Sequence, residues 1–145
     1  MPDIAPLKGL LYNQQLISNL DEVITPPFDV ISPEDQEMYH NRHPYNMIRL
    51  ILGRQKPGDN EYDNWHIRAA ETLAAWQKEG VLLRDSKPAF YDYEIDYQES
   101  PHKLRTRQGF ICLVRLHDFA HGSILPHERT YEATKTERLK LMQTC

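Results

Sequence analysis

The chain has 145 residues and a formal net charge of -4, and its composition is 40% hydrophobic and 26% charged. These values are typical of a globular protein with one buried core, and they exclude a disordered or fibrous chain. The negative charge disfavours generic binding to nucleic acid, because such a protein repels a phosphate polyanion. We therefore expect a single domain over residues 1–145, and the charge disfavours DNA as a partner.

The sequence contains no segment that predicts membrane insertion or secretion. No apolar run approaches the roughly 18–20 residues that cross a bilayer, and the N-terminus lacks the layout of a signal peptide. The only cysteines, Cys112 and Cys145, are too few for a disulfide framework or a multi-thiolate zinc site, which suits a reducing compartment. The expected location is the cytoplasm, with no membrane partner.

A proline-stiffened loop is the first distinctive feature along the chain. It follows an apolar segment over 4–13 that predicts an edge strand. Pro26 and Pro27 fix two successive φ angles, so the loop presents Phe28 and Asp29 in a stiff, extended conformation. Asp29 is therefore a candidate general base or metal-binding carboxylate. The alternative is a carboxylate that only caps its own turn.

Three elements are predicted between this loop and the middle of the chain. Ser32 is a suitable N-cap for a short helix over 33–41. The apolar alternation over 46–53 predicts a strand. Apolar residues at spacings of three and four over 61–79 predict a long helix, for which Gly80 is the expected C-cap.

The next part of the sequence predicts an antiparallel hairpin. Residues 88–98 alternate between polar and apolar, and the run 104–116 continues as a second strand after a polar turn. Gly109 within that run is a candidate β-bulge. A further short strand is expected at 123–125.

The chain is expected to end in a helix. Thr134 with Glu137 fits a capping box at its start, and no C-cap signal precedes Cys145. Taken in order, the elements predict an α+β fold in which three helices pack on a mixed, mainly antiparallel sheet. The missing C-cap signal indicates that the chain is the N-terminal portion of a longer protein.

The tripeptide His127-Glu128-Arg129 is the first candidate site. Pro126 removes a backbone donor, so the preceding strand is expected to stop there with its last side chains facing a rim. Glu128 is suited to accept a proton from a hydroxyl, and Arg129 to hold a phosphate or carboxylate through two hydrogen bonds. The alternative is a surface Glu-Arg ion pair, which contributes roughly 0–1 kcal/mol.

The predicted start of the final helix is a second candidate, for phosphate. Backbone N–H groups at a helix start attract anions, and Lys135 beside Thr134 would help to hold a phosphate. The P-loop pattern G-x-x-x-x-G-K-[ST] is absent, however. The alternative is a helix cap with a solvated lysine.

Histidines gather near the tripeptide without forming a metal-binding pattern. His117, His121 and His127 match no helical zinc signature and lie in a predicted loop, so we expect no metal site made by the protein alone. Magnesium that arrives with a nucleotide is a separate case, because it needs only one or two carboxylates.

Six segments of the sequence together resemble the prokaryotic family called domain of unknown function 1015. The resemblance covers nearly the whole chain, and PPFDVIS and LPHERT are its most specific parts. Family members are typically longer, which agrees with an N-terminal portion. The segments are, in order, 4-IAPLKGLLYN-13, 25-TPPFDVISPED-35, 44-PYNMIRLIL-52, 80-GVLLRDSKPAFYDYE-94, 107-RQGFICLVRL-116 and 125-LPHERT-130.

The family is in turn remotely similar to the ParB/sulfiredoxin group, which includes nucleotide-binding enzymes and free-serine kinases. That similarity implies a nucleotide-phosphate site at a G-x-x-R-like turn, for which 126-PHER-129 is the counterpart, with proline in place of glycine. The leading hypothesis is a nucleotide-dependent small-molecule phosphotransferase that uses a nucleotide with magnesium. Glu128 or Asp29 is the candidate base or metal carboxylate, and the candidate phosphate-binding residues are His127, Arg129, Thr130, Thr134 and Lys135.

Two other functions compete with this hypothesis. One is a non-catalytic ParB-like binding or regulatory module, against which the acidic net charge and the absence of a recognisable helix-turn-helix count. The other is a scaffold for a missing C-terminal part, to which the apolar residues of the final helix point. The sequence leaves open the substrate, the nucleotide and the oligomeric state.

Overall fold

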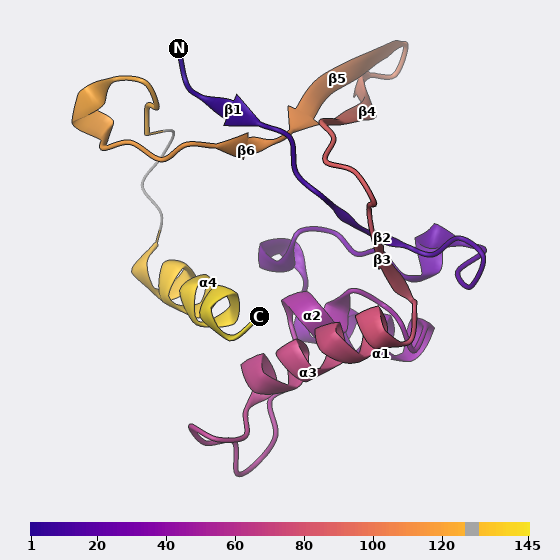
Figure 1. Ribbon diagram of the computed structural model, residues 1–145. Coiled ribbons are helices and arrows are strands. Elements are labelled where there is room, and N and C mark those ends of the chain that lie inside the picture. The colour runs from indigo at the N-terminus through magenta and orange to yellow at the C-terminus, as the bar shows by residue number, and fades with distance from the viewer. Residues whose placement is uncertain (127–130) are drawn as a thin grey trace. The chain divides into compact units, whose positions relative to one another are not determined.

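The computed structural model of the chain describes residues 1–126 and 131–145, and residue 133 is described without its side chain. The chain forms two compact units, whose elements are labelled in Figure 1. Unit 1 consists of Met1–Leu10 and Arg84–Arg129, and unit 2 of Leu11–Leu83 and Thr130–Cys145. Each unit is therefore assembled from two stretches that are far apart in the sequence.

The predicted α+β class is confirmed. The described residues contain four α-helices instead of the three expected, and their strands form three separate two-stranded sheets instead of one larger sheet. All four helices belong to unit 2. They are α1 (Pro33–Arg42), α2 (Ile48–Ile51), α3 (Trp65–Lys78) and α4 (Glu132–Thr144).

Helix α1 begins where the sequence predicts. Ser32 is the N-cap, and its side chain accepts a hydrogen bond of 3.1 Å from the backbone N–H of Asp35. The Asp35 carboxylate in turn accepts from the backbone N–H of Ser32, at 3.4 Å, which completes a capping box. Pro33 occupies the first turn, where its missing N–H costs no intrahelical bond.

The prediction of a strand over 46–53 is wrong, because this segment contains helix α2. Asn46 is fully buried, and its Oδ1 accepts from the backbone N–H of Ile48 at 3.0 Å while its Nδ2 donates to the carbonyl of Glu22 at 2.7 Å. The backbone N–H of Met47 donates to the carbonyl of Val23 at 2.7 Å. The two long-range bonds, to Glu22 and Val23, hold this segment in place while the local bond to Ile48 starts the helical turn, whereas a short apolar run alone does not distinguish strand from helix.

Helix α3 confirms the long helix but begins later than predicted. Asn64 is its N-cap and accepts from the backbone N–H groups of His66 and Ile67. Tyr62 therefore lies outside the helix and is 83% exposed, although its spacing suggested the buried face. Gly80 follows the helix with φ of 73°, the left-handed conformation that glycine adopts at helix ends.

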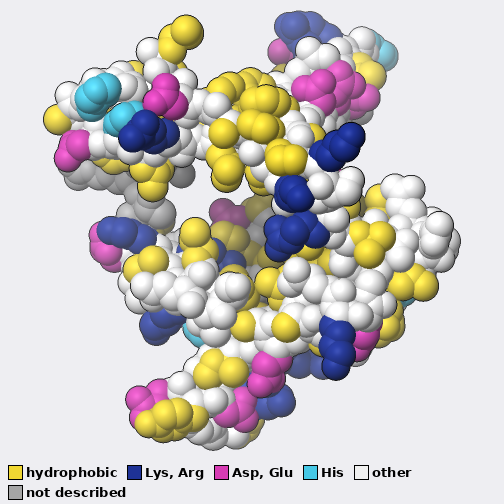
Figure 2. All heavy atoms as spheres, in the orientation of Figure 1, with side chains coloured by type: hydrophobic (Ala, Val, Ile, Leu, Met, Phe, Trp, Pro, Cys, Tyr) yellow, Lys and Arg dark blue, Asp and Glu magenta, His cyan; other side chains and the backbone are white. Residues whose placement is uncertain are grey.

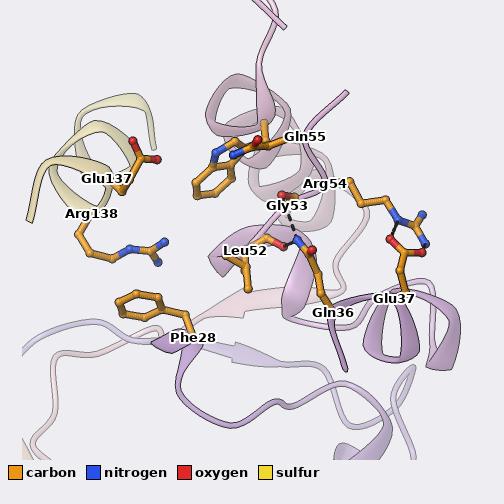
Figure 3. Close-up of a pocket in the computed structure, with 10 residues that line it drawn as sticks. Phe28, Gln36, Glu37, Leu52, Gly53, Arg54, Gln55, Glu137 and Arg138 are labelled. Atoms are coloured by element: carbon orange, nitrogen blue, oxygen red, sulfur yellow. Dashed lines mark hydrogen bonds and ion pairs between the residues drawn. The ribbon is translucent and has the colours of Figure 1, made fainter. Parts of the chain in front are cut away.

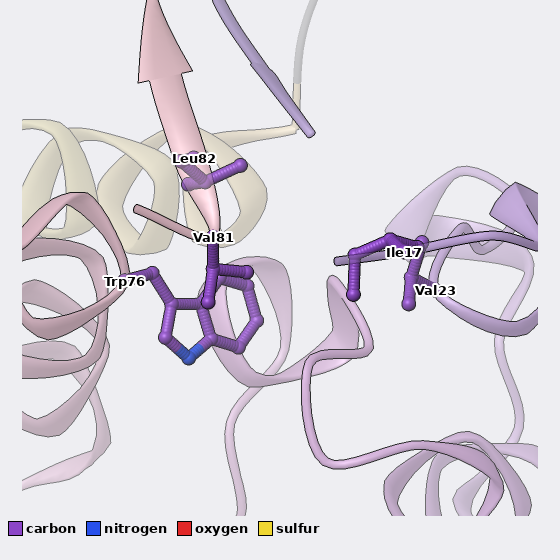
Figure 4. Packing of buried hydrophobic residues seen from close by; sticks show 5 residues of the cluster. All are labelled: Ile17, Val23, Trp76, Val81 and Leu82. Atoms are coloured by element: carbon purple, nitrogen blue, oxygen red, sulfur yellow. The ribbon is translucent and has the colours of Figure 1, made fainter. Parts of the chain in front are cut away.

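The core of unit 2 joins α3 to the segments that flank it. Trp76 of α3 packs in one cluster with Ile17, Val23, Val81 and Leu82, all at most 4% exposed (Figure 4). Partly buried side chains extend this cluster: Tyr12, Tyr45, Leu50 and Leu73. Hydrophobic burial of this kind is the main source of stability in a small domain.

Unit 1 is built mainly of strands. β1 (Ile4–Ala5) pairs antiparallel with β6 (Leu113–Val114), and the predicted hairpin is confirmed as β4 (Tyr91–Ser100) paired with β5 (Lys103–Ile111). Hydrophobic side chains gather on the surface over β1 and β6 (Figure 2). The third two-stranded sheet pairs β2 (Leu10–Tyr12) with β3 (Leu82–Arg84).

Three predictions about the strands differ from the structure. Gly109 is not a bulge but pairs regularly with Tyr93, and the register shifts between Gln98 and Ser100 instead. No strand forms at 123–125, where a 3-10 turn over Phe119–His121 is followed by bends. The single edge strand expected over 4–13 is divided into β1 and β2.

Candidate functional site

Unit 2 contains a cavity of about 520 Å³, which we call the Phe28 cavity (Figure 3). Its walls come from the 3-10 turn Phe28–Val30, from α1, from the residues after α2, from the start of α3 and from α4. The lining residues are Phe28, Gln36, Glu37, Leu52, Gly53, Arg54, Gln55, Trp65, Glu137 and Arg138.

Arg138 of α4 forms one wall of the cavity together with Phe28. Its guanidinium carbon lies 3.8 Å from the centre of the Phe28 ring and 5.9 Å from that of Trp65. One terminal nitrogen donates to the carbonyl of Ile51 at 2.8 Å, and burial lowers the pKa of the guanidinium. Within the described residues Nε has no hydrogen-bond partner, so the group is held by stacking and by one backbone contact.

The opposite wall is fixed by α1. Gln36 donates through Nε2 to the carbonyls of Leu52 and Gly53, at 2.8 and 3.3 Å, which ties α1 to the end of α2. Arg54 binds the Glu37 carboxylate through two nitrogens, and this pairing lowers the pKa of Glu37. The charge of Arg54 is therefore balanced within the wall, whereas Arg138 faces the cavity without an acidic partner among the described residues.

A second cavity of about 490 Å³ adjoins the first, and we call it the His66 cavity. The two share Gln55, Trp65 and Glu137. His66 is only 8% exposed, and its Nε2 lies 3.1 Å from Oε2 of Glu137. The other residues that line it are Lys56, Asp59, Asn60, Glu61, Asn64 and Lys140.

Four of the predicted site residues lie outside the described part of the chain. They are His127, Glu128, Arg129 and Thr130. Asp29 lies in the turn beside Phe28, with an exposed side chain. The structure thus places Asp29 one residue from the cavity wall.

The predicted capping box at Thr134 is wrong. Helix α4 begins at Glu132, and its N-cap Tyr131 makes no side-chain capping bond. Glu137 does not reach back to the helix start but contacts His66 on α3. Thr134 and Lys135 instead occupy the first turns of α4, where Lys135 lies 3.6 Å from the Glu132 carboxylate and is exposed.

Of the residues that line the cavities, only Phe28 stands out in the sequence as part of a distinctive loop. Trp65, Gln36, His66 and Arg138 were not predicted as site residues. Arg138 and Glu137 had one available signal, because charged residues within an apolar helix face are often paired. Their partners on α2, α3 and the proline-rich loop, however, lie more than 70 residues away in the sequence.

The described residues contain neither a metal-binding cluster nor a membrane span. No three His, Cys, Asp or Glu side chains among them come close enough to hold a metal ion. His117 and His121 stack on each other with ring centres 4.7 Å apart. Over the same residues, no helix is long and apolar enough to cross a bilayer.

Fold and cavity together define an α+β protein with a ligand-sized pocket walled by aromatic side chains and an arginine. The chain belongs to a family of proteins of unknown function, DUF1015, whose model matches residues 4–145. This confirms the family that PPFDVIS and LPHERT indicate. Neither the curated proteins nor the solved structures contain a match to the chain. Function must therefore be argued from the site itself.

Proposed function

We propose that this protein binds a nucleotide in the Phe28 cavity and transfers a phosphoryl group from it to a small molecule. The observation that carries the proposal is the contact of Phe28 with Arg138. Phe28 belongs to PPFDVIS, and Arg138 to the helix that follows LPHERT in the sequence. One specific motif of the family thus contributes Phe28 to the cavity wall, and the helix after the other motif contributes Arg138 to the same wall.

The lining of the cavity suits a nucleotide. Its volume of about 520 Å³ lies within the usual range for small-ligand sites. The ring of Phe28 offers aromatic surface of the kind that packs on bases, and the carboxamide of Gln55 offers hydrogen bonds to a base edge. A guanidinium has five donors, of which Arg138 uses one on Ile51, so donors remain for a phosphate.

The residues predicted from sequence keep supporting roles in this proposal. Thr134 and Lys135 lie four and three residues before Arg138, which places them on the same helix face. Asp29, next to Phe28, is the proposed carboxylate for magnesium. His127, Glu128, Arg129 and Thr130 lie outside the described residues, so the phosphate-binding and acid–base roles proposed for them rest on the sequence alone.

Isothermal titration calorimetry tests the binding step. ATP, ADP, GTP and CTP are each titrated with and without magnesium into the wild-type chain, Arg138→Gln and Arg129→Ala. We expect one nucleotide to bind with a magnesium-dependent affinity, and each substitution to weaken it about tenfold or more, as loss of a charged hydrogen bond predicts. Arg42→Gln is the matched control, because Arg42 is exposed on α1 and does not line either cavity.

The same titrations can overturn the proposal. If no nucleotide binds in either magnesium condition, or if Arg138→Gln binds as tightly as Arg42→Gln, the Phe28 cavity is not a nucleotide site. Binding without turnover of the nucleotide would instead favour the non-catalytic regulatory module. Circular dichroism of each variant separates loss of the site from loss of the fold.

A further inference from the structure

We infer that the hairpin of unit 1 binds single-stranded RNA on one of its two faces, which we call the tyrosine face. This face is formed by Tyr93, Ile95 and Tyr97 of β4 together with Arg105 and Arg107 of β5. It belongs to a different unit from the Phe28 cavity, and the inference does not depend on the proposed nucleotide site. Failure of either proposal therefore leaves the other standing.

The register of the hairpin brings aromatic and basic side chains together. Alternate residues of a strand point to opposite faces, and directly paired residues of neighbouring strands share a face. Ile95 pairs with Arg107 and Tyr97 pairs with Arg105, so both arginines lie on the same face as the tyrosines. β4 itself contains no basic residue, and the combination therefore arises only when the two strands pair.

The opposite face of the hairpin is acidic. The side chains of β4 and β5 that point to it include three carboxylates and no basic group. The carboxylates are those of Asp92, Glu94 and Asp96. Acidic and basic side chains are thus segregated to different faces, and only the tyrosine face suits an anion.

The tyrosine face carries a net positive charge. Glu99 Oε2 lies 3.2 Å from Nε of Arg105 and also contacts Lys103, and among the described residues no other carboxylate pairs with these two cations. With Arg107, three positive charges face one negative charge, which leaves a formal charge of +2 (3 − 1 = 2). Salt screens charges beyond about 8–10 Å, so this local charge outweighs the net charge of -4 for a ligand bound here.

The side chains of the tyrosine face are open to a ligand. Ile95 and Tyr97 are 48% and 47% exposed, and both arginines are exposed. Tyr93 is half-buried, because its ring packs against the backbone at Gly109, where the missing side chain makes room for it. One ring is therefore fixed by the opposite strand, whereas the ring of Tyr97 is free for stacking.

Single-stranded RNA is the partner that fits this combination of groups. Aromatic rings and guanidinium groups stack on unpaired bases, and exposed cations pair with the phosphates between them. An acidic peptide offers charge without planar bases, and a duplex hides the faces of its bases. The phenol hydroxyls of Tyr93 and Tyr97 add hydrogen-bonding groups at the ring edges, which suit the 2′-hydroxyl that distinguishes RNA from DNA.

Fluorescence anisotropy of a labelled uridine strand tests the inference on the full chain. We expect binding at low salt, and contact with two or three phosphates predicts that affinity falls about sevenfold to twentyfold between about 50 and about 200 mM salt. The competing probes are a deoxyuridine strand of the same length, an RNA duplex and a polyglutamate peptide. Each should bind at least about fivefold more weakly than the uridine strand, because each lacks the 2′-hydroxyl, the unpaired bases or the bases altogether.

Substitutions separate stacking from charge. Tyr97→Ala should weaken RNA binding about fivefold to a hundredfold with an unchanged salt dependence, as loss of one base stack predicts. Tyr97→Phe keeps the ring and should keep most of the affinity. Arg107→Gln should lower the slope of log Kd against log salt by about 0.7, because it removes one phosphate contact. Arg107 suits this test because it pairs with no acidic side chain among the described residues.

Arg115→Gln is the matched control, since Arg115 is exposed in unit 1 outside the hairpin, and it should bind RNA as the wild type does. Absence of RNA binding at low salt, or equal binding by Tyr97→Ala, Arg107→Gln and Arg115→Gln, overturns the tyrosine face as a binding site. Equal affinity for the DNA strand or the duplex overturns the choice of single-stranded RNA. Equal affinity for the peptide replaces it with a general anion-binding surface. Circular dichroism of each variant separates loss of binding from loss of the fold.

Discussion

The guanidinium carbon of Arg138 lies 3.8 Å from the centre of the Phe28 ring, although 110 positions separate the two residues in the sequence (138 − 28 = 110). This contact connects α4 to the proline-stiffened turn and encloses one side of the Phe28 cavity (Figure 3). A cation held over an aromatic face is stabilised by the electrostatic field of the ring. The same contact that shapes the cavity therefore also holds α4 in unit 2.

We predict that Phe28→Ala destabilises unit 2 by about 1–3 kcal/mol, because it removes the cation–π contact and part of the buried ring surface. Urea unfolding followed by tryptophan fluorescence measures this, since both tryptophans, Trp65 and Trp76, belong to unit 2. Phe119→Ala is the control, because that ring is 60% exposed in unit 1. Equal urea midpoints for Phe28→Ala and the wild type would contradict the contact.

The buried His40 is expected to make unit 2 sensitive to acid. Burial, then the nearby charges of Arg54 and Arg49, lower its pKa from 6.5 to about 4. Between these values the unfolded chain binds a proton that the folded chain does not, so stability falls as the pH drops from about 6.5 to about 4. The loss attributable to His40 amounts to about 2–3 kcal/mol at the lower pH.

Urea unfolding of His40→Leu at pH values across this range tests the prediction. The variant should lose less stability on acidification than the wild type, because leucine gains no proton in the unfolded chain. His102→Leu, in the exposed turn of the hairpin, should keep the wild-type pH dependence. If His40→Leu and the wild type show parallel pH curves, His40 is not the source of the sensitivity.

The amide of Asn46 is predicted to be essential for helix α2. Asn46→Leu would leave the carbonyl of Glu22 and the backbone N–H of Ile48 without the bonds that Asn46 supplies in a buried position. We expect a loss of about 2–4 kcal/mol in the free energy of unfolding, as unsatisfied buried polar groups cost. The measurement is a urea midpoint, with exposed Asn41→Leu on α1 as the matched control. Similar midpoints for both variants would disprove the role of the amide.

The hairpin is predicted to require glycine at position 109. A Cβ built there would lie 2.3 Å from a ring carbon of Tyr93, the cross-strand partner of Gly109. Gly109→Ala should therefore displace the ring and destabilise unit 1 by about 1–2 kcal/mol. Thermal unfolding monitored by circular dichroism measures the effect. The double variant Gly109→Ala with Tyr93→Ala should show a positive coupling of similar size, and strictly additive effects would rule out the clash.

Local signals in the sequence predicted several elements well. The N-cap at Ser32 needs only neighbouring residues, and the periodicity that gave α3 and the hairpin is likewise contained within each element. The strand expected over 46–53 failed because its short apolar run is compatible with both strand and helix. The choice was made by bonds from Asn46 and Met47 to residues more than 20 positions earlier.

The sequence by itself determined the family and the α+β class, and it predicted a site in the proline-rich loop that carries Phe28 and Asp29. Only the tertiary structure decided that Phe28 meets Arg138, that Glu137 contacts His66 instead of capping its own helix, and that two cavities share Glu137. The physical reason is that helix caps and periodicity depend on neighbours along the chain. A cavity depends on which distant side chains the burial of apolar surface brings together.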